Sequence, residues 1–117
     1  MAYKILVACP NYDGKAYSMQ KWIDAVKALT YPGLTILQID NSDTTQFADQ
    51  YSNQIPITHI DLPNEGPNRR IALSMDEIRK VALAGNYDYW FNVEADIIIP
   101  PNTIETLFLY GLEADWI

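Results

Sequence analysis

Four short apolar segments alternate along the chain with longer segments whose apolar residues recur at helical spacing. Residues 3–9 (YKILVAC) are almost continuously apolar and stop at Pro10, which is typical of a strand buried on both faces of a parallel sheet. Residues 34–39 (LTILQI) predict a second strand, and the aromatic residues 87–93 (YDYWFNV) predict a fourth. Residues 55–62 alternate more weakly and predict a third strand between them.

The intervals between these strands carry helical patterns. The first interval has one apolar stripe and ends at the Tyr-Pro-Gly turn of residues 31–33. A short polar helix through Phe47 and Tyr51 is expected next, and a longer helix begins near Asn68 and stops at Gly85. The apolar stripes of the two long helices comprise Met19, Trp22, Ile23, Val26 and Leu29, and Ile71, Met75, Ile78 and Ala82.

A last helix is predicted near the end of the chain. Asn102 is its capping residue, Glu105 completes a capping box, and Gly111 ends the helix. Strands that alternate with helices indicate an α/β fold, in which a Rossmann-like, mostly parallel sheet has helices on both faces. Residues 114–117 look like the start of another strand, so we expect a truncated sheet.

The composition limits the class of protein. With 117 residues, 49% of them hydrophobic, the chain has the size of one small domain. Its formal charge of −7 leaves no basic surface for nucleic acid or anionic membranes. Apolar stretches of about seven or eight residues are too short to form a membrane-spanning segment. The single cysteine, Cys9, excludes an internal disulfide, and we expect a cytoplasmic protein.

Acidic and amide side chains follow three of the predicted strands, at residues 10–13, 40–43 and 94–96. Because the carboxyl ends of parallel strands meet at one edge of an open sheet, we expect these segments to converge. Carboxylates that share a site repel one another, and a hard cation such as Mg²⁺ or Mn²⁺ accepts their oxygens while keeping positions for phosphate. The chain has neither a P-loop nor a GxGxxG motif. A carboxylate–metal–diphosphate bridge is therefore the expected way to bind a nucleotide.

Three segments resemble a known family. DYWFNVEADIIIPPNTIETL is similar to the acidic metal-binding segment of GT-A glycosyltransferases, most of all those of glycosyltransferase family 2. ILVACPNYDG resembles that family's first strand and loop, and LTILQIDNSDT resembles its second strand, which ends in Asp and Ser. The resemblance implies that residues 1–117 form a single nucleotide-sugar-binding α/β domain, with the acceptor-binding half absent.

The resemblance also implies roles for individual residues. Asp96 matches the carboxylate that coordinates the metal on the donor diphosphate, and Glu94, where the family more often has Asp, would contact the ribose or the metal. Asp40 matches the acid that accepts hydrogen bonds from the nucleobase, with Ser42 in the same segment. The loop around base and ribose corresponds to Pro10, Asn11 and Tyr12.

A cation for the diphosphate is expected on the third predicted helix. Helices of this architecture begin at the ligand edge, so Arg70 is favoured over Arg79, which lies about 13 Å further along and on the opposite face. The family often carries Arg-Asn in the middle of this helix, where this chain has Met75-Asp76.

The implied reaction is the metal-dependent transfer of a sugar from a UDP- or GDP-sugar to an acceptor hydroxyl. The carboxylate base of inverting members normally lies beyond the end of this chain, and no motif supplies one here. A non-catalytic nucleotide-sugar-binding module, or a truncated remnant that acts through a partner, is therefore the alternative. A phosphate-accepting receiver domain is a second alternative, but the Asp after its third strand and the Lys after its fifth cannot be placed.

The remaining candidates favour structural roles. His59 has no Ser or Cys partner in a recognisable motif and is assigned no function. The aromatic residues at 87–91 are expected in the core and on the sheet surface. An unfinished sheet would leave an unpaired edge, which predicts a homodimer.

Overall fold

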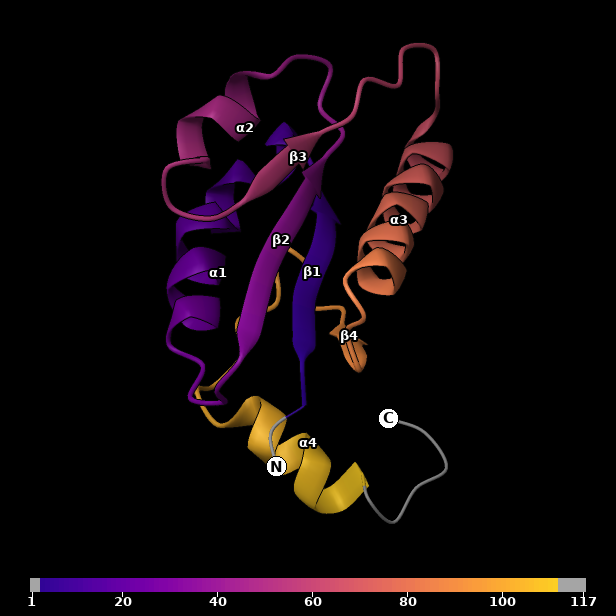
Figure 1. Cartoon of the computed structure of the whole chain (residues 1–117). Coiled ribbons are helices and arrows are strands. Elements are labelled where there is room, and N and C mark those ends of the chain that lie inside the picture. The colour runs from indigo at the N-terminus through magenta and orange to yellow at the C-terminus, as the bar shows by residue number, and fades with distance from the viewer. Residues whose placement is uncertain (1–2, 112–117) are drawn as a thin grey trace.

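The computed structural model describes residues 3–111 (Figure 1). The predicted strand at residues 114–117 lies outside the described residues. The elements follow the predicted order, and each predicted helix and strand within the described residues is confirmed. In chain order they are β1 (Ile5–Asn11), the 3₁₀ helix η1 (Asp13–Lys15), α1 (Ala16–Lys27), β2 (Leu34–Asp40), α2 (Gln46–Tyr51), β3 (Ile57–His59), α3 (Pro67–Ala84), β4 (Tyr89–Phe91) and α4 (Thr103–Gly111).

The four described strands form one parallel sheet with the order β3-β2-β1-β4. β1 lies in the middle, where Ile5 pairs with Leu34 on one side and with Tyr89 on the other. The expected α/β fold with a parallel sheet is therefore confirmed. Because the strands are parallel, the carboxyl ends of β1, β2 and β4, which the three polar segments follow, lie at one edge of the sheet.

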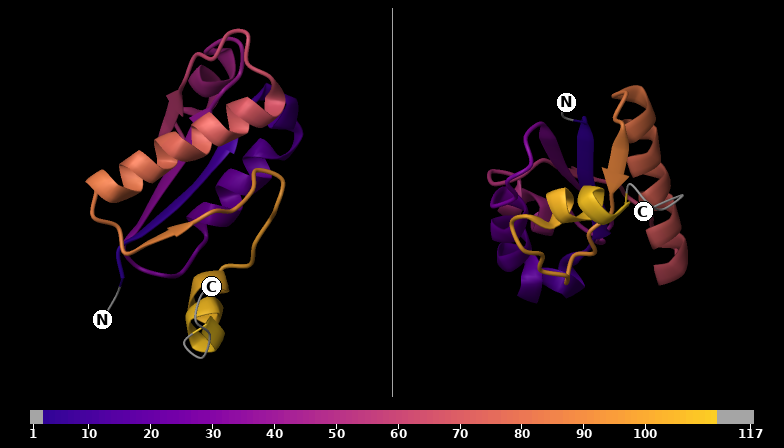
Figure 2. Two further views of the ribbon diagram at one scale, coloured as in Figure 1. Left: turned by 90° about the vertical axis from the view of Figure 1, so that its right-hand side faces the viewer. Right: turned by 90° about the horizontal axis from the view of Figure 1, so that it is seen from below.

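Helices cover both faces of the sheet, with α1 and α2 on one face and α3 on the other (Figures 1 and 2). The alternation of β1 explains this arrangement, because successive side chains point to opposite faces. Ile5, Val7 and Cys9 belong to the core under α1, whereas Leu6 and Ala8 pack with Ile78 of α3 in a second core. The continuous apolar pattern of β1 is thus explained by burial on both faces.

Burial also determines the state of the one cysteine. Cys9 is fully buried, and the loss of solvation raises the pKa of its thiol to about 12. The thiol is therefore neutral at physiological pH and packs as a small apolar side chain, as the sequence indicated.

The two outer strands are shorter than predicted. β3 spans Ile57–His59 rather than residues 55–62, and β4 spans Tyr89–Phe91 rather than residues 87–93. β3 pairs only with the last residues of β2, and β2 ends at Asp40, opposite His59. Apolar residues continue beyond each strand because Ile55 and Val93 are buried in the core without belonging to the sheet.

The end of α3 differs from the prediction in one detail. The helix stops before Gly85, but Asn86 and not Gly85 takes the left-handed conformation, with φ of 55°. Asn86 N–H donates to Leu83 O and Tyr87 N–H donates to Ala82 O, the hydrogen bonds of a Schellman motif. Gly85 leaves room for the Tyr87 ring, since a Cβ there would lie 2.4 Å from Cε2 of that ring.

α4 lies near the end of the sheet where the strands begin (Figures 1 and 2). Its Phe108 stacks on Tyr3 with ring centroids 5.1 Å apart. Glu105, predicted to complete a capping box, instead accepts a hydrogen bond from the Thr30 hydroxyl and so ties α4 to the turn before β2. Among residues 3–111, no helix is both long and apolar enough to cross a membrane.

Candidate functional site

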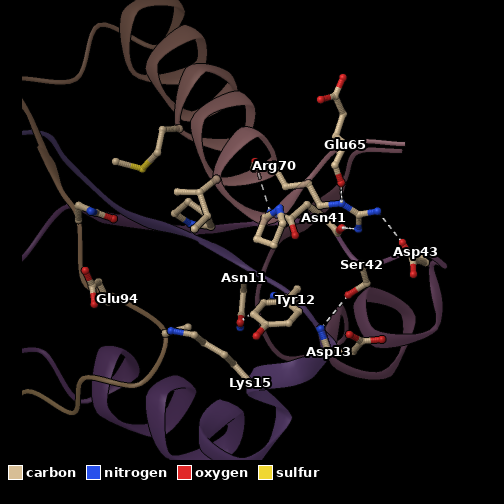
Figure 3. A pocket seen from close by; sticks show the side chains of 16 residues that line it. Asn11, Tyr12, Asp13, Lys15, Asn41, Ser42, Asp43, Glu65, Arg70 and Glu94 are labelled. Carbon is tan, nitrogen blue, oxygen red and sulfur yellow. Dashed lines mark hydrogen bonds and ion pairs between the residues drawn. The ribbon is translucent and has the colours of Figure 1, made fainter. Parts of the chain in front are cut away.

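A pocket of about 780 Å³ lies where the carboxyl ends of β1 and β2 meet the start of α3 (Figure 3). Its volume lies within the range of small-molecule sites, and its position is where open parallel sheets bind ligands. The walls combine acidic, basic, amide and apolar side chains. They comprise Pro10, Asn11, Tyr12, Asp13, Lys15, Asn41, Ser42, Asp43, Glu65, Pro67, Arg70, Ile71, Met75, Asn92, Glu94 and Ala95.

The side chain of Asn11, the last residue of β1, anchors the loop that follows this strand. This buried side chain accepts the backbone N–H of Tyr12 at 2.8 Å and donates to Gln38 Oε1 at 2.9 Å. Gln38 is itself fully buried, and its Nε2 has no hydrogen-bond partner within the described part of the chain. Asn11 therefore shapes the pocket loop from the core, while Tyr12 is exposed beside it.

The Tyr12 ring lies directly over Gly14. A Cβ at Gly14 would be 2.2 Å from Cε2 of that ring, so only glycine leaves the ring its present place. The backbone of Gly14 is not in the left-handed region, so its conformation does not require glycine. The close approach of the Tyr12 ring is what favours glycine here.

We expect Gly14→Ala to change the pocket without unfolding the protein. The added methyl group displaces the free end of the exposed Tyr12 side chain, so the midpoint of urea unfolding should stay nearly constant. The position of the ring changes, so the tyrosine fluorescence or the NMR ring signals of Tyr12 should shift. The matched variant Gly66→Ala, where a Cβ meets nothing within 4 Å, should leave these signals unchanged. Unaltered Tyr12 signals in Gly14→Ala would contradict the expectation.

The segment after β2 contributes its backbone and three of its side chains to the site. Asn41, Ser42 and Asp43 line the pocket, but Asp40 does not. Asp40 is fully buried; its Oδ1 accepts hydrogen bonds from the N–H and the hydroxyl of Ser42, and its Oδ2 lies 2.8 Å from His59 Nδ1. The carboxylate predicted to contact a nucleobase thus has its oxygens bonded within the protein.

Arg70, the expected cation for a diphosphate, lines the pocket at the first turn of α3 (Figure 3). All three guanidinium nitrogens have partners: Glu65 O at 3.0 Å, Asn41 O at 2.8 Å and Asp43 Oδ1 at 2.7 Å. The side chain therefore clamps the loop after β2 to the loop before α3. Arg79, by contrast, pairs with the surface residue Asp76, where its hydrogen bond lowers the pKa of that carboxyl.

Lys15 is a second cation in the pocket. It ends η1, and its Nζ lies 3.4 Å from Asp96 Oδ2, with about a third of each side chain exposed. The sequence pattern predicted that this acidic cluster would need a bound cation, and the structure supplies one from the protein itself. Lys15 was not predicted, because nothing in its sequence neighbourhood shows that η1 turns it toward residue 96.

The acidic segment after β4 is anchored through its backbone. Trp22 Nε1 donates to Val93 O at 3.2 Å, and the Ser18 hydroxyl donates to Ala95 O at 2.9 Å. Both donors lie on α1, so this helix fixes the two carboxylates on either side of the buried Ala95. Glu94 lines the pocket on the side opposite Asp43 (Figure 3), and Asp96 reaches Lys15.

The fit to a metal ion is partial. Within residues 3–111, no three His, Cys, Asp or Glu side chains are grouped so as to hold one. Glu94 and Asp96 are the two carboxylates at the predicted place, and Mg²⁺ is typically held by one or two carboxylates together with substrate phosphates. The residues therefore fit a cation that a diphosphate completes, and they do not form a metal cage of their own.

Most predicted site residues do lie together. Pro10, Asn11, Tyr12, Ser42, Arg70 and Glu94 line one pocket. Asp96 lies outside that lining but contacts Lys15, and Asp40 lies behind Ser42. The sequence reading missed the apolar wall of α3, formed by Ile71 and Met75, whose helical spacing indicated core positions.

Comparison with solved structures finds the same architecture in S. aureus TarS, a glycosyltransferase. The crystal structure of TarS matches with a TM-score of 0.61 at 18% identity, over 94% of this chain and 20% of the TarS chain. The crystal structure of TarS 1-349 in complex with UDP gives a TM-score of 0.59 at 15% identity, over 94% of this chain and 32% of the TarS chain. The complex with UDP-GlcNAc gives a TM-score of 0.60 at 15% identity, over 94% of this chain and 31% of the TarS chain. The chain has a GT-A-like fold.

The likeness to TarS concerns the fold, since identities of 15% to 18% are low. This GT-A-like chain spans between 20% and 32% of the length of the TarS chains. A scan against models of known protein families and a search of curated proteins find no match.

Proposed function

We propose that this chain binds the nucleoside diphosphate part of a UDP-sugar and serves in transfer of the sugar to an acceptor hydroxyl, in the manner of glycosyltransferase family 2. The observation that carries the proposal is the pocket at the carboxyl edge of a GT-A-like sheet, lined by an exposed tyrosine, two cations and four acidic residues, with Asp96 beside it in contact with Lys15. The TarS structures that share this fold bind UDP and UDP-GlcNAc.

The nucleoside is proposed to lie against the loop after β1. Tyr12 offers an exposed aromatic ring, and Pro10 offers an apolar surface beside it. The amide of Asn41 and the hydroxyl of Ser42 line the same region, although both already take part in hydrogen bonds within the protein. The carboxylate of Asp40 is buried and bonded to Ser42 and His59. Asp40 is therefore proposed to hold Ser42 in place and not to contact the nucleobase.

The diphosphate is proposed to lie between the start of α3 and the acidic segment after β4. Lys15 and Arg70 bring positive charge to the pocket, and the first turn of α3 has no acidic residue and no side-chain cap. Glu94 and Asp96 would hold the Mn²⁺ or Mg²⁺ ion with the phosphate oxygens. When bound, such a cation stabilises the negative charge that develops on the departing diphosphate.

The test is a calorimetric titration of the purified chain with UDP and UDP-GlcNAc, with and without Mn²⁺. We expect binding that Mn²⁺ strengthens about tenfold or more. Asp96→Ala should remove this gain, because one of the two carboxylates is lost. The matched variant Asp24→Ala removes an exposed acid from the outer side of α1 and should retain the gain.

Two outcomes would contradict the proposal. Absence of UDP binding by the folded chain in either buffer would overturn nucleotide recognition. Binding that is equally strong without Mn²⁺, and unchanged in Asp96→Ala, would overturn the metal site and leave Lys15 and Arg70 as the cations of the pocket.

A donor-binding module without catalysis is the second candidate. It accounts for the pocket as far as the structure describes it, because the residues there are proposed to bind nucleotide and metal and none is assigned to deprotonate an acceptor hydroxyl. Release of UDP from UDP-GlcNAc, followed over time with the 117-residue chain, separates the two candidates. Metal-dependent binding without UDP release supports the module.

A further inference from the structure

A connected series of side chains leads from β3 to the pocket. His59 Nδ1 lies 2.8 Å from Asp40 Oδ2, and Asp40 Oδ1 accepts the hydroxyl of Ser42 at 2.6 Å. Ser42 Oγ in turn accepts the backbone N–H of Asp13 at 2.8 Å. These contacts join β3, the end of β2 and η1, three segments that are distant in the sequence.

The series is buried where it crosses the sheet. Asp40 and Ser42 are 0% and 3% exposed, and the side chain of His59 is 16% exposed. A buried carboxylate needs hydrogen-bond donors, and a carboxylate only accepts, so the contact with Asp40 assigns the hydrogen of the His59 ring to Nδ1. The pairing register fixes this contact, because His59 lies directly opposite Asp40 on the neighbouring strand.

The far end of the series fixes the start of η1. Tyr12 occupies the N-cap position of this 3₁₀ helix and makes no side-chain capping hydrogen bond. The Ser42 hydroxyl therefore holds the N–H of Asp13 in its place. Tyr12 and Lys15, which flank that point, are the residues that bring the aromatic ring and the ammonium group to the pocket.

We propose that His59 is a positioning residue for the nucleotide: it orients Asp40, Asp40 orients Ser42, and Ser42 holds the Tyr12–Lys15 segment in its binding conformation. This inference rests on the proposed function, because it names what prepares the same pocket. His59 itself is not one of the residues that line the pocket. Removing its Nδ1–H leaves one oxygen of a buried carboxylate without its donor, which frees Asp40 and then Ser42 to turn.

The test compares His59→Leu with His59→Asn, whose amide N–H stands near the position of Nδ1. Two quantities are measured: the UDP affinity by calorimetry, and the NMR shift of the Asp13 amide in the ligand-free chain. We expect His59→Leu to weaken UDP binding about tenfold and to shift the Asp13 amide. His59→Asn should restore both, and Thr58→Val, an exposed change on the same strand, should alter neither.

An unchanged Asp13 amide in folded His59→Leu would overturn the inference, as would a His59→Asn variant that is folded but not restored. Should His59→Leu fail to fold, His59→Gln replaces it, because its amide reaches toward the Nε2 position and away from Asp40. If the wild-type chain binds no UDP, the proposed function fails separately. The Asp13 amide of the ligand-free variants then still decides whether His59 controls the loop.

Discussion

Replacing Trp22 with alanine is expected to lower the free energy of unfolding by about 3–5 kcal/mol. Trp22 is the largest fully buried side chain among residues 3–111, and it lies in the core between α1 and the sheet. The substitution leaves a cavity and removes the donor to Val93 O. Domains of this size are stable by about 5–15 kcal/mol, so the loss is a large part of the whole. Urea unfolding followed by circular dichroism measures it.

Two further variants separate the contributions of Trp22. Trp22→Phe keeps most of the ring but leaves the buried Val93 carbonyl without its donor, and should cost about 1–3 kcal/mol. Tyr17→Ala removes an aromatic side chain that is 73% exposed on the same helix and should change stability by no more than about 0.5 kcal/mol. A Trp22→Ala variant as stable as Tyr17→Ala would show that the core under α1 is described incorrectly.

Lys15→Met is expected to weaken UDP binding about tenfold in metal-free buffer and much less when Mn²⁺ is present. Among the described residues that line the pocket, Lys15 and Arg70 are the cationic ones, and Arg70 already has three hydrogen-bond partners. Without metal, the diphosphate therefore depends on Lys15. With metal, loss of Lys15 frees Asp96 for the cation and offsets part of the defect. Calorimetry in EDTA and in Mn²⁺ measures both.

The control for this prediction is Lys21→Met, which removes the same charge from an exposed position on α1. It should leave the UDP affinity unaltered in both buffers. An equal loss for Lys15→Met with and without Mn²⁺ would mean that Lys15 and the metal do not share Asp96.

The sequence predicts the elements of this fold well because its long patterns are unambiguous. The continuous apolar run of residues 5–9 corresponds to a strand that is buried on both faces. The apolar stripe of α1 corresponds to a helix that is buried on one face. The weak alternation over residues 55–62 overestimated the length of β3, which stops at His59 because the partner strand ends at Asp40. Strand length at the edge of a sheet depends on the neighbour and not on the strand's own residues.

The position of the candidate site at the carboxyl edge of the sheet could be predicted from the sequence, but several of its contacts could not. Because parallel strands end at one edge, residues 10–12, Ser42 and Glu94 were expected to lie close together, and they line one pocket. It could not show that Asp40 points into the protein, since this depends on the donor His59 in another strand. It also could not show that Lys15 reaches Asp96, because that contact depends on the turn of η1. The predictions of a bound metal and of a homodimer stay predictions.

The central place of β1 has a consequence for synthesis of the protein on the ribosome. β1 leaves the ribosome first, yet its second neighbour, β4, is made only after α3. Contacts between residues so far apart in the chain form slowly, and the apolar β1 keeps one unpaired edge until Phe91 has emerged. We expect nascent chains that end before β4 to associate with chaperones, and this association to cease once β4 is available for pairing.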